Sequence, residues 1–305
     1  MRHMRIWRYV DEAARLGSLR KAAEQLNITP SALQRRIQDV EEDLGAEIFE
    51  RSAQGIRLTA AGESFIRWVR AQSADLDRVR SQIEDLSGLR RGRVRIACSQ
   101  ALVGSFLADE ISTFRERFPL VSFDIRVASQ GDAMAMLADF SADIAIIFSP
   151  RRTAELQPLM TLGQQVVAIM AADHPLAGRP SLRLRDCAPF PIALPDASFG
   201  TRAILDELLA VSSVGLLIEL ESNSFEMLRN LARSGRVITF QIEIGAPSPI
   251  FDPGLTVIPL SDADLAHGPL VLGQQKGRTL PVAAAKFAEQ IARRLDEMRR
   301  MPQLS

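Results

Sequence analysis

The chain has 305 residues, of which 47% are hydrophobic and 24% charged, and these ordinary globular values exclude a disordered protein. Lys+Arg and Asp+Glu each number 37, so the net charge is zero. Up to residue 95, however, there are 18 basic and 14 acidic residues, against 19 and 23 in the remainder. This excess of positive charge at the amino-terminal end favours a nucleic-acid contact confined to that end.

The chain lacks the sequence signals of several other protein classes. Its apolar runs are too short to span a bilayer, and the first 17 residues carry charges where a secretory signal is apolar, so we expect a cytoplasmic protein. Two cysteines and three scattered histidines, with no CxxC or HExxH motif, predict neither a metal site nor a disulfide framework, and no cofactor motif is present. A length near 300 favours two domains.

Three short helices are predicted in the first 45 residues. Apolar residues at helical spacing indicate the first, up to residue 16. The second and third are expected at 18–26 and 30–44, because Ser18 and Thr29 are favourable N-cap residues and Pro30 fits a first helical position. Two helices joined by such a tight turn form a helix-turn-helix.

The third helix presents a polar face made of Ser31, Gln34, Arg35 and Gln38, with Arg36 to one side. Gln and Arg can make bidentate hydrogen bonds to base edges in the major groove, and Ser can bond to bases or phosphates. This face is therefore predicted to read DNA. The alternative is an ordinary solvated helix face, since exposed charged faces are common.

A hairpin is expected next, from extended segments at 47–51 and 56–58 with Gly55 in the turn. A hairpin after a recognition helix forms a wing, and Arg51 and Arg57 are placed to meet the phosphate backbone or the minor groove. Thr59 then caps a further helix.

These motifs together resemble the winged helix-turn-helix of LysR-type transcriptional regulators. The resemblance rests on Gly17-Ser18, Ala22–Asn27, Arg36-Ile37, Glu41–Gly45, Ile48–Arg51 and Arg57–Gly62. It covers about the first 65 residues without a gap and implies a DNA-binding domain at 1–62. The residues expected to contact double-stranded operator DNA are Ser18, Thr29, Pro30, Ser31, Gln34, Arg35, Arg36, Arg51 and Arg57. The family usually has Gln or Ser at Pro30 and Ser at Gln34, so the operator sequence does not carry over.

A long helix is predicted at 63–90, with a narrow seam of residues spaced alternately by four and three. The seam consists of Phe65, Val69, Gln72, Leu76, Val79, Ile83 and Leu86. Such a heptad seam favours a partner helix, and the alternative is an amphipathic helix packed on its own domain. The resemblance implies a linker helix that pairs across a dimer, and a tetramer is a further expectation from the family.

From residue 93 onward, predicted strands alternate with predicted helices. The strands are expected at 94–97, 121–127, 143–148, 166–170, 192–194, 216–220 and 237–240. The helices are expected at 101–118, 132–140, 201–209, 223–234 and 281–298. This βαβ succession predicts an α/β domain with a parallel sheet and helices on its faces.

Polar residues follow several of these strands, where open α/β sheets bind their ligands. The candidates are Ser99, Gln100, Ser129, Phe148 at a strand end, Thr201 and Asn223. Hydroxyls, amides and free backbone N–H groups at such places suit a small anion, most naturally a carboxylate. The alternative for each position is a plain N-cap.

The resemblance extends more loosely to this part, through Gly92–Ile96, Arg117–Pro119, Asp143–Ile146 and Lys286-Phe287. It implies an effector-binding domain at 91–302 with a periplasmic-binding-protein-like fold. Two subdomains are implied, 93–163 with 268–302 and 164–267, with the effector in the cleft between them. The chain has Gln241 and its neighbours where the family usually has a more apolar, Pro-containing stretch, and Gln241 joins the expected effector contacts.

Two other functions compete with this interpretation. An enzyme has little support, because no GxSxG, GxxxxGK[ST] or GxGxxG motif occurs. A transport-type binding protein would fit the α/β domain but has no use for the first 62 residues. The sequence therefore predicts a transcriptional regulator that is not an enzyme and is controlled by a small effector. Its expected partners are operator DNA, the effector, a second copy of the chain and RNA polymerase.

Overall fold

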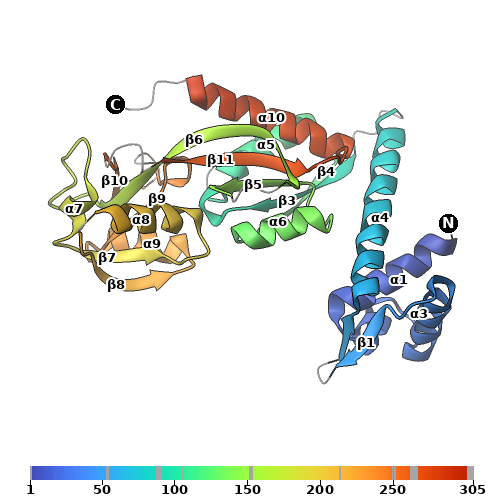
Figure 1. Cartoon of the computed structure of the whole chain (residues 1–305). Helices are drawn as coiled ribbons and strands as arrows, with labels where there is room; N and C mark the ends of the chain where they lie inside the picture. Colours follow the sequence, from blue (N-terminus) through green and yellow to red (C-terminus); the bar gives the residue numbers. More distant parts are fainter. Residues whose placement is uncertain are drawn as a thin grey trace. The chain divides into compact units, whose positions relative to one another are not determined.

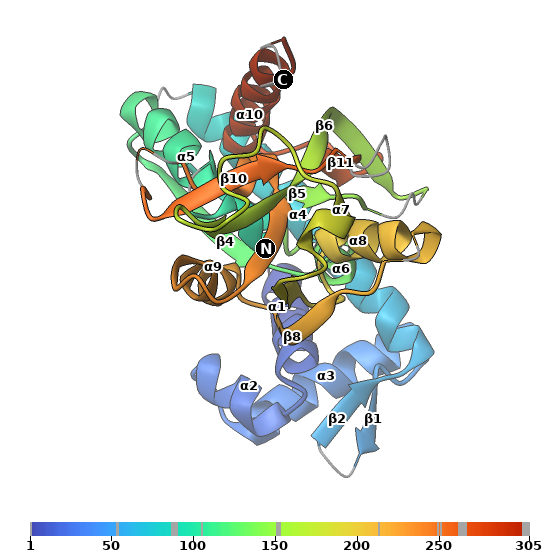
Figure 2. The ribbon, with the colours of Figure 1, turned by 90° about the vertical axis from the view of Figure 1, so that its left-hand side faces the viewer.

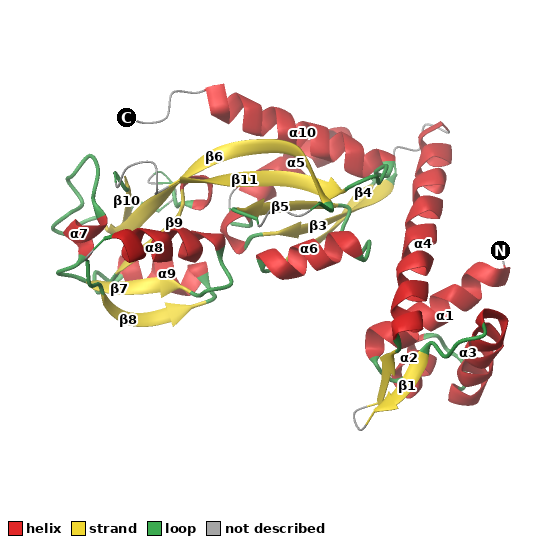
Figure 3. Cartoon of the chain, viewed as in Figure 1, coloured by secondary structure: helices red, strands yellow, loops and turns green. Residues whose placement is uncertain are grey.

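The computed structural model describes residues 2–52, 55–86, 91–104, 106–150, 154–212, 214–248, 250, 252–261 and 267–300. The chain divides into two compact units between Arg80 and Ser81. The first unit consists of helices and one hairpin, and the second contains a large sheet with helices on its faces (Figures 1 and 3). Each unit is described by itself.

The first unit begins with the predicted helix-turn-helix. Its helices are α1 (Arg2–Leu16), α2 (Leu19–Gln25) and α3 (Pro30–Leu44). The Ser18 hydroxyl accepts a hydrogen bond from the backbone N–H of Lys21, and the Thr29 hydroxyl accepts one from Ala32 at 3.2 Å. Both predicted N-caps are therefore confirmed, and they satisfy N–H groups that a helix start leaves unpaired.

Small side chains allow the helices of the first unit to approach closely. Ala22 and Ala23 on α2 are fully buried, and the core around them contains Tyr9, Val10, Ala13, Leu33, Ile37, Ile48 and Ile66. Larger residues at the two alanines would separate α2 from its neighbours. The packing thus fixes how α3 is held against α1 and α2.

The predicted wing is present as an antiparallel hairpin beside α3 (Figure 2). Its strands are β1 (Phe49–Ser52) and β2 (Gly55–Leu58). The Glu41 carboxylate on α3 accepts hydrogen bonds from the backbone N–H of Ile48 at 2.8 Å and of Phe49 at 3.2 Å. This contact ties the start of the wing to the recognition helix.

A single helix, α4 (Ala60–Leu86), follows the wing and begins at the Thr59 cap. Val69 is almost fully buried, whereas Val79 is 40% and Ile83 58% exposed. An apolar seam that leaves the core in this way is typical of a helix with a partner, so pairing through α4 stays a prediction. Positions 87–90 of the expected linker lie outside the described residues.

The second unit is built on one nine-stranded sheet in the part of the chain that the structure describes. Its strands are β3 (Gly92–Cys98), β4 (Val121–Val127), β5 (Ile144–Phe148), β6 (Leu156–Ala171), β7 (Pro191–Pro195), β8 (Leu217–Ser222), β9 (Ile238–Ile242), β10 (Leu255–Pro259) and β11 (His267–Gln275). Their order is β4-β3-β5-β11-β6-β9-β7-β8, and β10 pairs with β6.

The sheet is mixed, so the prediction of a parallel sheet was correct only within each half. The β4-β3-β5 and β9-β7-β8 groups are parallel, whereas β11 is antiparallel to β5 and β6, and β6 is antiparallel to β9. We call the first group with its helices the first lobe and the second group with its helices the second lobe. The long antiparallel strands β6 and β11 join the two lobes.

The helices of the second unit lie on the faces of this sheet (Figure 1). They are η1 (Gln100–Leu102), α5 (Phe106–Arg117), α6 (Gln130–Ala138) and α10 (Val282–Arg300) in the first lobe, and α8 (Gly200–Val211), α9 (Phe225–Arg233) and η2 (Glu243–Gly245) in the second, with α7 (Leu184–Cys187) before β7. The helix expected at 101–118 is therefore divided: a 3-10 turn comes first, and α5 starts at Phe106.

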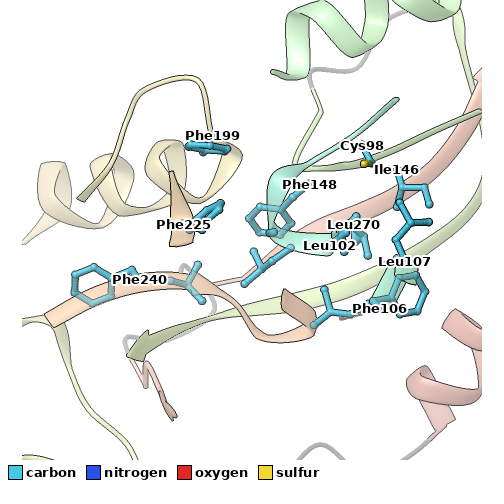
Figure 4. Packing of buried hydrophobic residues seen from close by; sticks show 14 of the residues in the cluster. Cys98, Leu102, Phe106, Leu107, Ile146, Phe148, Phe199, Phe225, Phe240 and Leu270 are labelled. Carbon is cyan, nitrogen blue, oxygen red and sulfur yellow. The ribbon is translucent and has the colours of Figure 1, made fainter. Parts of the chain in front are cut away.

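One hydrophobic core extends through both lobes. Figure 4 shows Phe148 and Leu102 of the first lobe lying beside Phe199 and Phe225 of the second. The rings of Phe199 and Phe225 are 4.6 Å apart. Burial of these large side chains stabilises the contact between the lobes, at about 2 kcal/mol for each fully buried one.

A buried ion cluster holds the start of β5. Asp143 is 0% exposed and accepts hydrogen bonds from the Arg95 guanidinium at 2.9 Å and the Arg278 guanidinium at 2.7 Å. Arg278, which lies between β11 and α10, also donates to the backbone oxygen of Ala142 at 2.8 Å. One carboxylate thus links three segments that are distant in sequence.

Replacing Asp143 with alanine is expected to destabilise the second unit by about 3 kcal/mol or more, because two arginines would lose their carboxylate in the interior. Urea unfolding followed by circular dichroism measures this loss. Arg126→Ala is the control, since its 3.1 Å pair with Asp124 is exposed and should contribute less than about 1 kcal/mol. Equal losses in the two variants would contradict a structural role of the buried cluster.

Candidate functional site

The exposed face of α3 carries the polar side chains that the sequence assigns to DNA. Ser31, Gln34 and Arg35 are exposed, as are Thr29 and Pro30 at the start of the helix. Gln38 lies one turn beyond Gln34 on the same face. A helix that presents amides and a guanidinium in this way fits the hydrogen-bonding pattern of a major groove.

Arg36 differs from its neighbours on α3. It is only partly exposed, and its guanidinium carbon lies 5.2 Å from the centre of the Tyr9 ring on α1. A cation over an aromatic face is stabilised by the ring quadrupole. The structure therefore places Arg36 against its own fold, while its contact with DNA stays a prediction.

The two arginines of the wing lie on opposite faces of the hairpin. Arg51 pairs with Ile56 across the strands, and Arg57 pairs with Glu50. Because side chains alternate along a strand, Arg51 shares a face with the partly buried Ile56, and Arg57 points the other way. The two side chains cannot both approach one phosphate group.

A hollow of about 390 Å³ lies between α3 and the wing. Gln34, Gln38 and Arg51 line it together with the carboxylates of Glu41, Glu47 and Glu50. The hollow places Arg51 beside the recognition face, so this arginine and the two glutamines are brought together at one surface. Arg57 does not line it.

In the second unit the candidate effector residues lie at strand ends or helix starts, where the lobes meet. Ser99 follows β3 and caps η1, and its backbone N–H donates to the oxygen of Ile146 at 3.1 Å. Ser129 caps α6 and hydrogen-bonds the Asp132 carboxylate at 2.7 Å. Both serine hydroxyls thus serve as N-caps, which was the alternative interpretation for each.

Side-chain amides connect the lobes. The Gln100 side-chain oxygen accepts a hydrogen bond from the backbone N–H of Phe225, at the start of α9, at 2.7 Å. The Gln130 amide donates to the backbone oxygens of Phe148 at 2.8 Å and Ser149 at 3.1 Å. Gln100 therefore joins the first lobe to a helix start in the second, a position at which an anion would also be stabilised.

Two glycines permit the lobes to touch through their backbones. A Cβ on Gly200, at the start of α8, would lie 2.4 Å from the backbone oxygen of Phe148. A Cβ on Gly245 in η2 would lie 2.3 Å from the backbone oxygen of Ala101. Neither distance is compatible with a side chain, so the observed contact requires glycine at both positions.

The remaining candidates differ in accessibility. Thr201 and Phe148 are almost fully buried, and Gln241 is 0% exposed within β9, where its amide donates to the backbone oxygen of Gly245 at 2.5 Å. Asn223 is exposed just before α9. An effector could reach Asn223 directly, but Gln241 only after the junction opens.

Sequence reasoning missed Gln164. Its side-chain oxygen accepts a hydrogen bond from the backbone N–H of Ile244 at 2.8 Å in the interior. Gln164 lies in the middle of β6, and nothing in its local pattern distinguishes it from an exposed strand residue. Its partner is 80 positions away, so only the tertiary structure reveals the contact.

Neither the Cys98 thiol nor any cluster of metal-binding side chains among the described residues indicates reactive chemistry in the second unit. Burial raises the pKa of the Cys98 thiol to about 12, so the thiol stays protonated at neutral pH. Across the described residues, no three His, Cys, Asp or Glu side chains are grouped to hold a metal ion. No described helix has the length and apolar character needed to cross a membrane.

Two family models match the chain. The model for bacterial regulatory helix-turn-helix proteins of the lysR family matches residues 4–63. The model for the LysR substrate binding domain matches residues 87–296, which is more than half of the chain. The first match falls on the winged helix-turn-helix, and the second on the two-lobed unit.

Individual regulators of this kind are similar to the chain in sequence or in structure. The HTH-type transcriptional regulator CbbR of Sinorhizobium medicae is 32% identical over 208 residues, which cover 68% of this chain and 66% of CbbR, just under two thirds of its length. CbnR complexed with its target DNA has a TM-score of 0.64 at 17% identity, over 96% of this chain and 99% of CbnR. The effector binding domain of QuiR in complex with shikimate has a TM-score of 0.58 at 17% identity, over 68% of this chain and 98% of the QuiR domain. The two solved structures support the fold.

Gly200→Ala is expected to weaken the contact between the lobes, because its methyl group would overlap the backbone oxygen of Phe148. Overpacking of this kind costs about 1–3 kcal/mol, or several degrees in the melting temperature of the second unit. Gly178→Ala is the matched control, since no atom lies within 4 Å of its Cβ position and neither glycine has a positive φ. Differential scanning calorimetry that finds equal melting in both variants would rule out the close contact.

Proposed function

The chain belongs to the LysR family of bacterial transcriptional regulators, and from this premise we propose that it binds a specific operator under the control of a small carboxylate-bearing effector. The observation that carries the proposal is the exposed row of Ser31, Gln34 and Arg35 on a capped α3 beside a wing. This function needs no catalytic residue and no cofactor. We place the protein in the cytoplasm, where its DNA is.

In this proposal α3 enters the major groove. Gln34 and Arg35 read base edges, and Ser31 bonds to a base or a phosphate. Thr29 and Pro30, exposed at the amino end of α3, lie next to the phosphate backbone, and so does Ser18 at the start of α2. The wing adds Arg51 beside the recognition face and Arg57 on its far side, while Arg36 supports α3 from Tyr9.

Operator binding by a dimer follows from the seam on α4. Residues 1–62 would form the DNA-binding domain, 63–90 the pairing helix and 91–302 the effector-binding domain, with subdomain boundaries near 163 and 268. Two recognition helices would then meet half-sites about 34–36 Å apart, or a multiple of that spacing. CbnR complexed with its target DNA supports DNA binding by this fold. Tetramer formation and contact with RNA polymerase are parts of the same proposal.

The effector is proposed to bind between the lobes. Ser99, Gln100, Ser129, Phe148, Thr201, Asn223 and Gln241 are the proposed contacts. The complex of the QuiR effector binding domain with shikimate, a small carboxylic acid, supports this choice of ligand. A ligand that contacts both lobes has different affinities for their closed and open arrangements, which is what control requires.

Arg35→Ala is expected to abolish specific operator binding. A bidentate arginine–guanine contact contributes about 1–3 kcal/mol, so the affinity should fall about 10- to 100-fold, toward that for unrelated DNA. Footprinting on genomic fragments, starting with the DNA that flanks the gene, identifies the operator. Fluorescence anisotropy then measures the affinity for this operator of the unmodified chain and of each variant.

Arg67→Ala is the control for that loss, because it removes the same charge from the exposed surface of α4 in the same unit. It should keep most of the specific affinity. Unchanged operator affinity of Arg35→Ala, with circular dichroism showing an intact fold, would exclude Arg35 from base recognition.

Ser99→Ala is expected to remove the response to the effector while operator binding persists. The hydroxyl lies just after β3 at the cap of η1, and its loss would remove the proposed hydrogen bond to the ligand. A panel of small carboxylic acids, tested for changes in operator affinity, provides the measurement. Ser141→Ala, exposed after α6, should respond as the unmodified chain does. A normal response of Ser99→Ala would remove Ser99 from the site.

A further inference from the structure

Arg229 lies on α9, one turn after the helix begins, and its side chain extends toward the first lobe. The guanidinium Nη2 is 3.7 Å from the position that a Cβ on Gly104 would occupy. Gly104 belongs to the segment between η1 and α5 in the first lobe. The guanidinium therefore sits where the two lobes meet, next to the Gln100–Phe225 hydrogen bond that joins them.

This guanidinium is partly buried and has few hydrogen-bond partners. In the described chain its only hydrogen bond runs from Nε to the backbone oxygen of Phe225, in its own helix, at 3.3 Å, and it makes no ion pair. Burial lowers the pKa of Arg229, which reflects the cost of a charge that has left water. The nearby carboxylates of Asp252 and Glu226 offset only part of this cost.

Two other arginines of the second lobe provide the contrast. Arg233, one turn further along α9, forms an ion pair with Asp252 at 2.5 Å. Arg202 on α8 pairs with Glu221 at 3.0 Å and with Asp206 at 2.7 Å. Asp252 is therefore already engaged by Arg233, and Arg229 is left with hydrogen-bonding capacity that no described side chain uses.

The first lobe brings a second positive group to the same place. Helix α5 has 12 residues and starts at Phe106, two positions after Gly104. The amino end of such a helix carries a partial positive charge and free backbone N–H groups. Asp109 in the first turn of α5 offsets part of this positive charge, and an anion between the guanidinium and the helix start would stabilise both.

A buried acceptor under the same segment is also unsatisfied. The side-chain oxygen of Gln241 is fully buried and has no hydrogen-bond donor among the described residues. Its amide nitrogen lies beside Gly245, which contacts the backbone oxygen of Ala101. A carboxylate or phosphate cannot donate to this oxygen, so only a hydroxyl or other donor group of the same ligand could pair it.

We propose that Arg229 is the anion-binding residue of the effector site and holds a carboxylate or phosphate group of the effector against the start of α5. This inference rests on the proposed control by an effector and names the group that would recognise the ligand's charge. The planar guanidinium suits both oxyanions, since each can accept two parallel hydrogen bonds from it. An anion held in this way contacts both lobes at once.

The test uses the full chain and three salts at equal ionic strength: sodium chloride as reference, sodium succinate and sodium phosphate. The melting temperature of the second unit is measured by differential scanning fluorimetry. Succinate or phosphate is expected to raise it by about 5 °C at saturating concentration, relative to chloride. A rise with succinate alone identifies a carboxylate ligand, and a rise with phosphate alone identifies a phosphate ligand.

Arg229→Gln is expected to lose this rise in melting temperature. Without added anion, this variant should melt at the same temperature as the unmodified chain or above it, because an unpaired buried charge has been removed. Arg233→Gln is the matched control on the same helix and should keep the rise. Arg229→Lys retains a charge without the planar fork and should keep a smaller rise, which provides the test if Arg229→Gln does not fold.

Three results would overturn the proposal. The first is that neither anion raises the melting temperature of the unmodified chain. The second is that the rise persists in Arg229→Gln. The third is that Arg233→Gln loses the rise as completely as Arg229→Gln does. Operator binding is measured alongside, and Arg229→Gln should retain it. Operator binding without an anion response would reject this inference alone, whereas failure of the unmodified chain to bind any operator would reject the proposed function.

Discussion

Strand β6 is the element on which the second unit depends, because it belongs to both lobes. Its residues up to Gln165 pair with β11, and from Val166 onward it pairs with β9 and β10. One continuous backbone thus hydrogen-bonds to the sheet of the first lobe and then to the sheet of the second. The carboxyl ends of the parallel strands in the two lobes are thereby brought together, and the helix starts that follow them meet at a single junction.

The local parts of this architecture could be predicted from the sequence. Ser18, Thr29 and Pro30 mark helix starts because the chemistry of an N-cap lies within three residues, and the winged helix-turn-helix followed from such signals. The stacking of Arg36 on Tyr9 was not predictable in the same way. It depends on how α1 packs against α3, across 27 positions of sequence, and an arginine on a polar helix face gives no sign of an aromatic neighbour.

The long strands were predicted poorly for a physical reason. The first ten residues of β6 include Pro158, Gly163 and three glutamines, and β11 includes Gly268, Pro269 and Gly273, so neither shows the apolar alternation of an ordinary strand. Their stability comes from pairing with each other along nine registered positions. For the same reason the candidate site was only half predicted. The residues at strand ends were found, whereas Gln164 has its partner 80 positions away, and the hydrogen bond that Arg229 makes among the described residues stays within its own helix.

The way the lobes touch also limits how an effector could act. Gly200 and Gly245 bring backbone atoms of one lobe against the other, and the Gln100 oxygen already occupies the first N–H of α9. A ligand that only replaced Gln100 would exchange one hydrogen bond for another and would change the balance between arrangements little. An anionic ligand that binds Arg229 beside the start of α5 would instead gain contacts that exist only while the lobes are together. Its binding energy would therefore depend on closure, which is the condition under which a small molecule can control a larger structure.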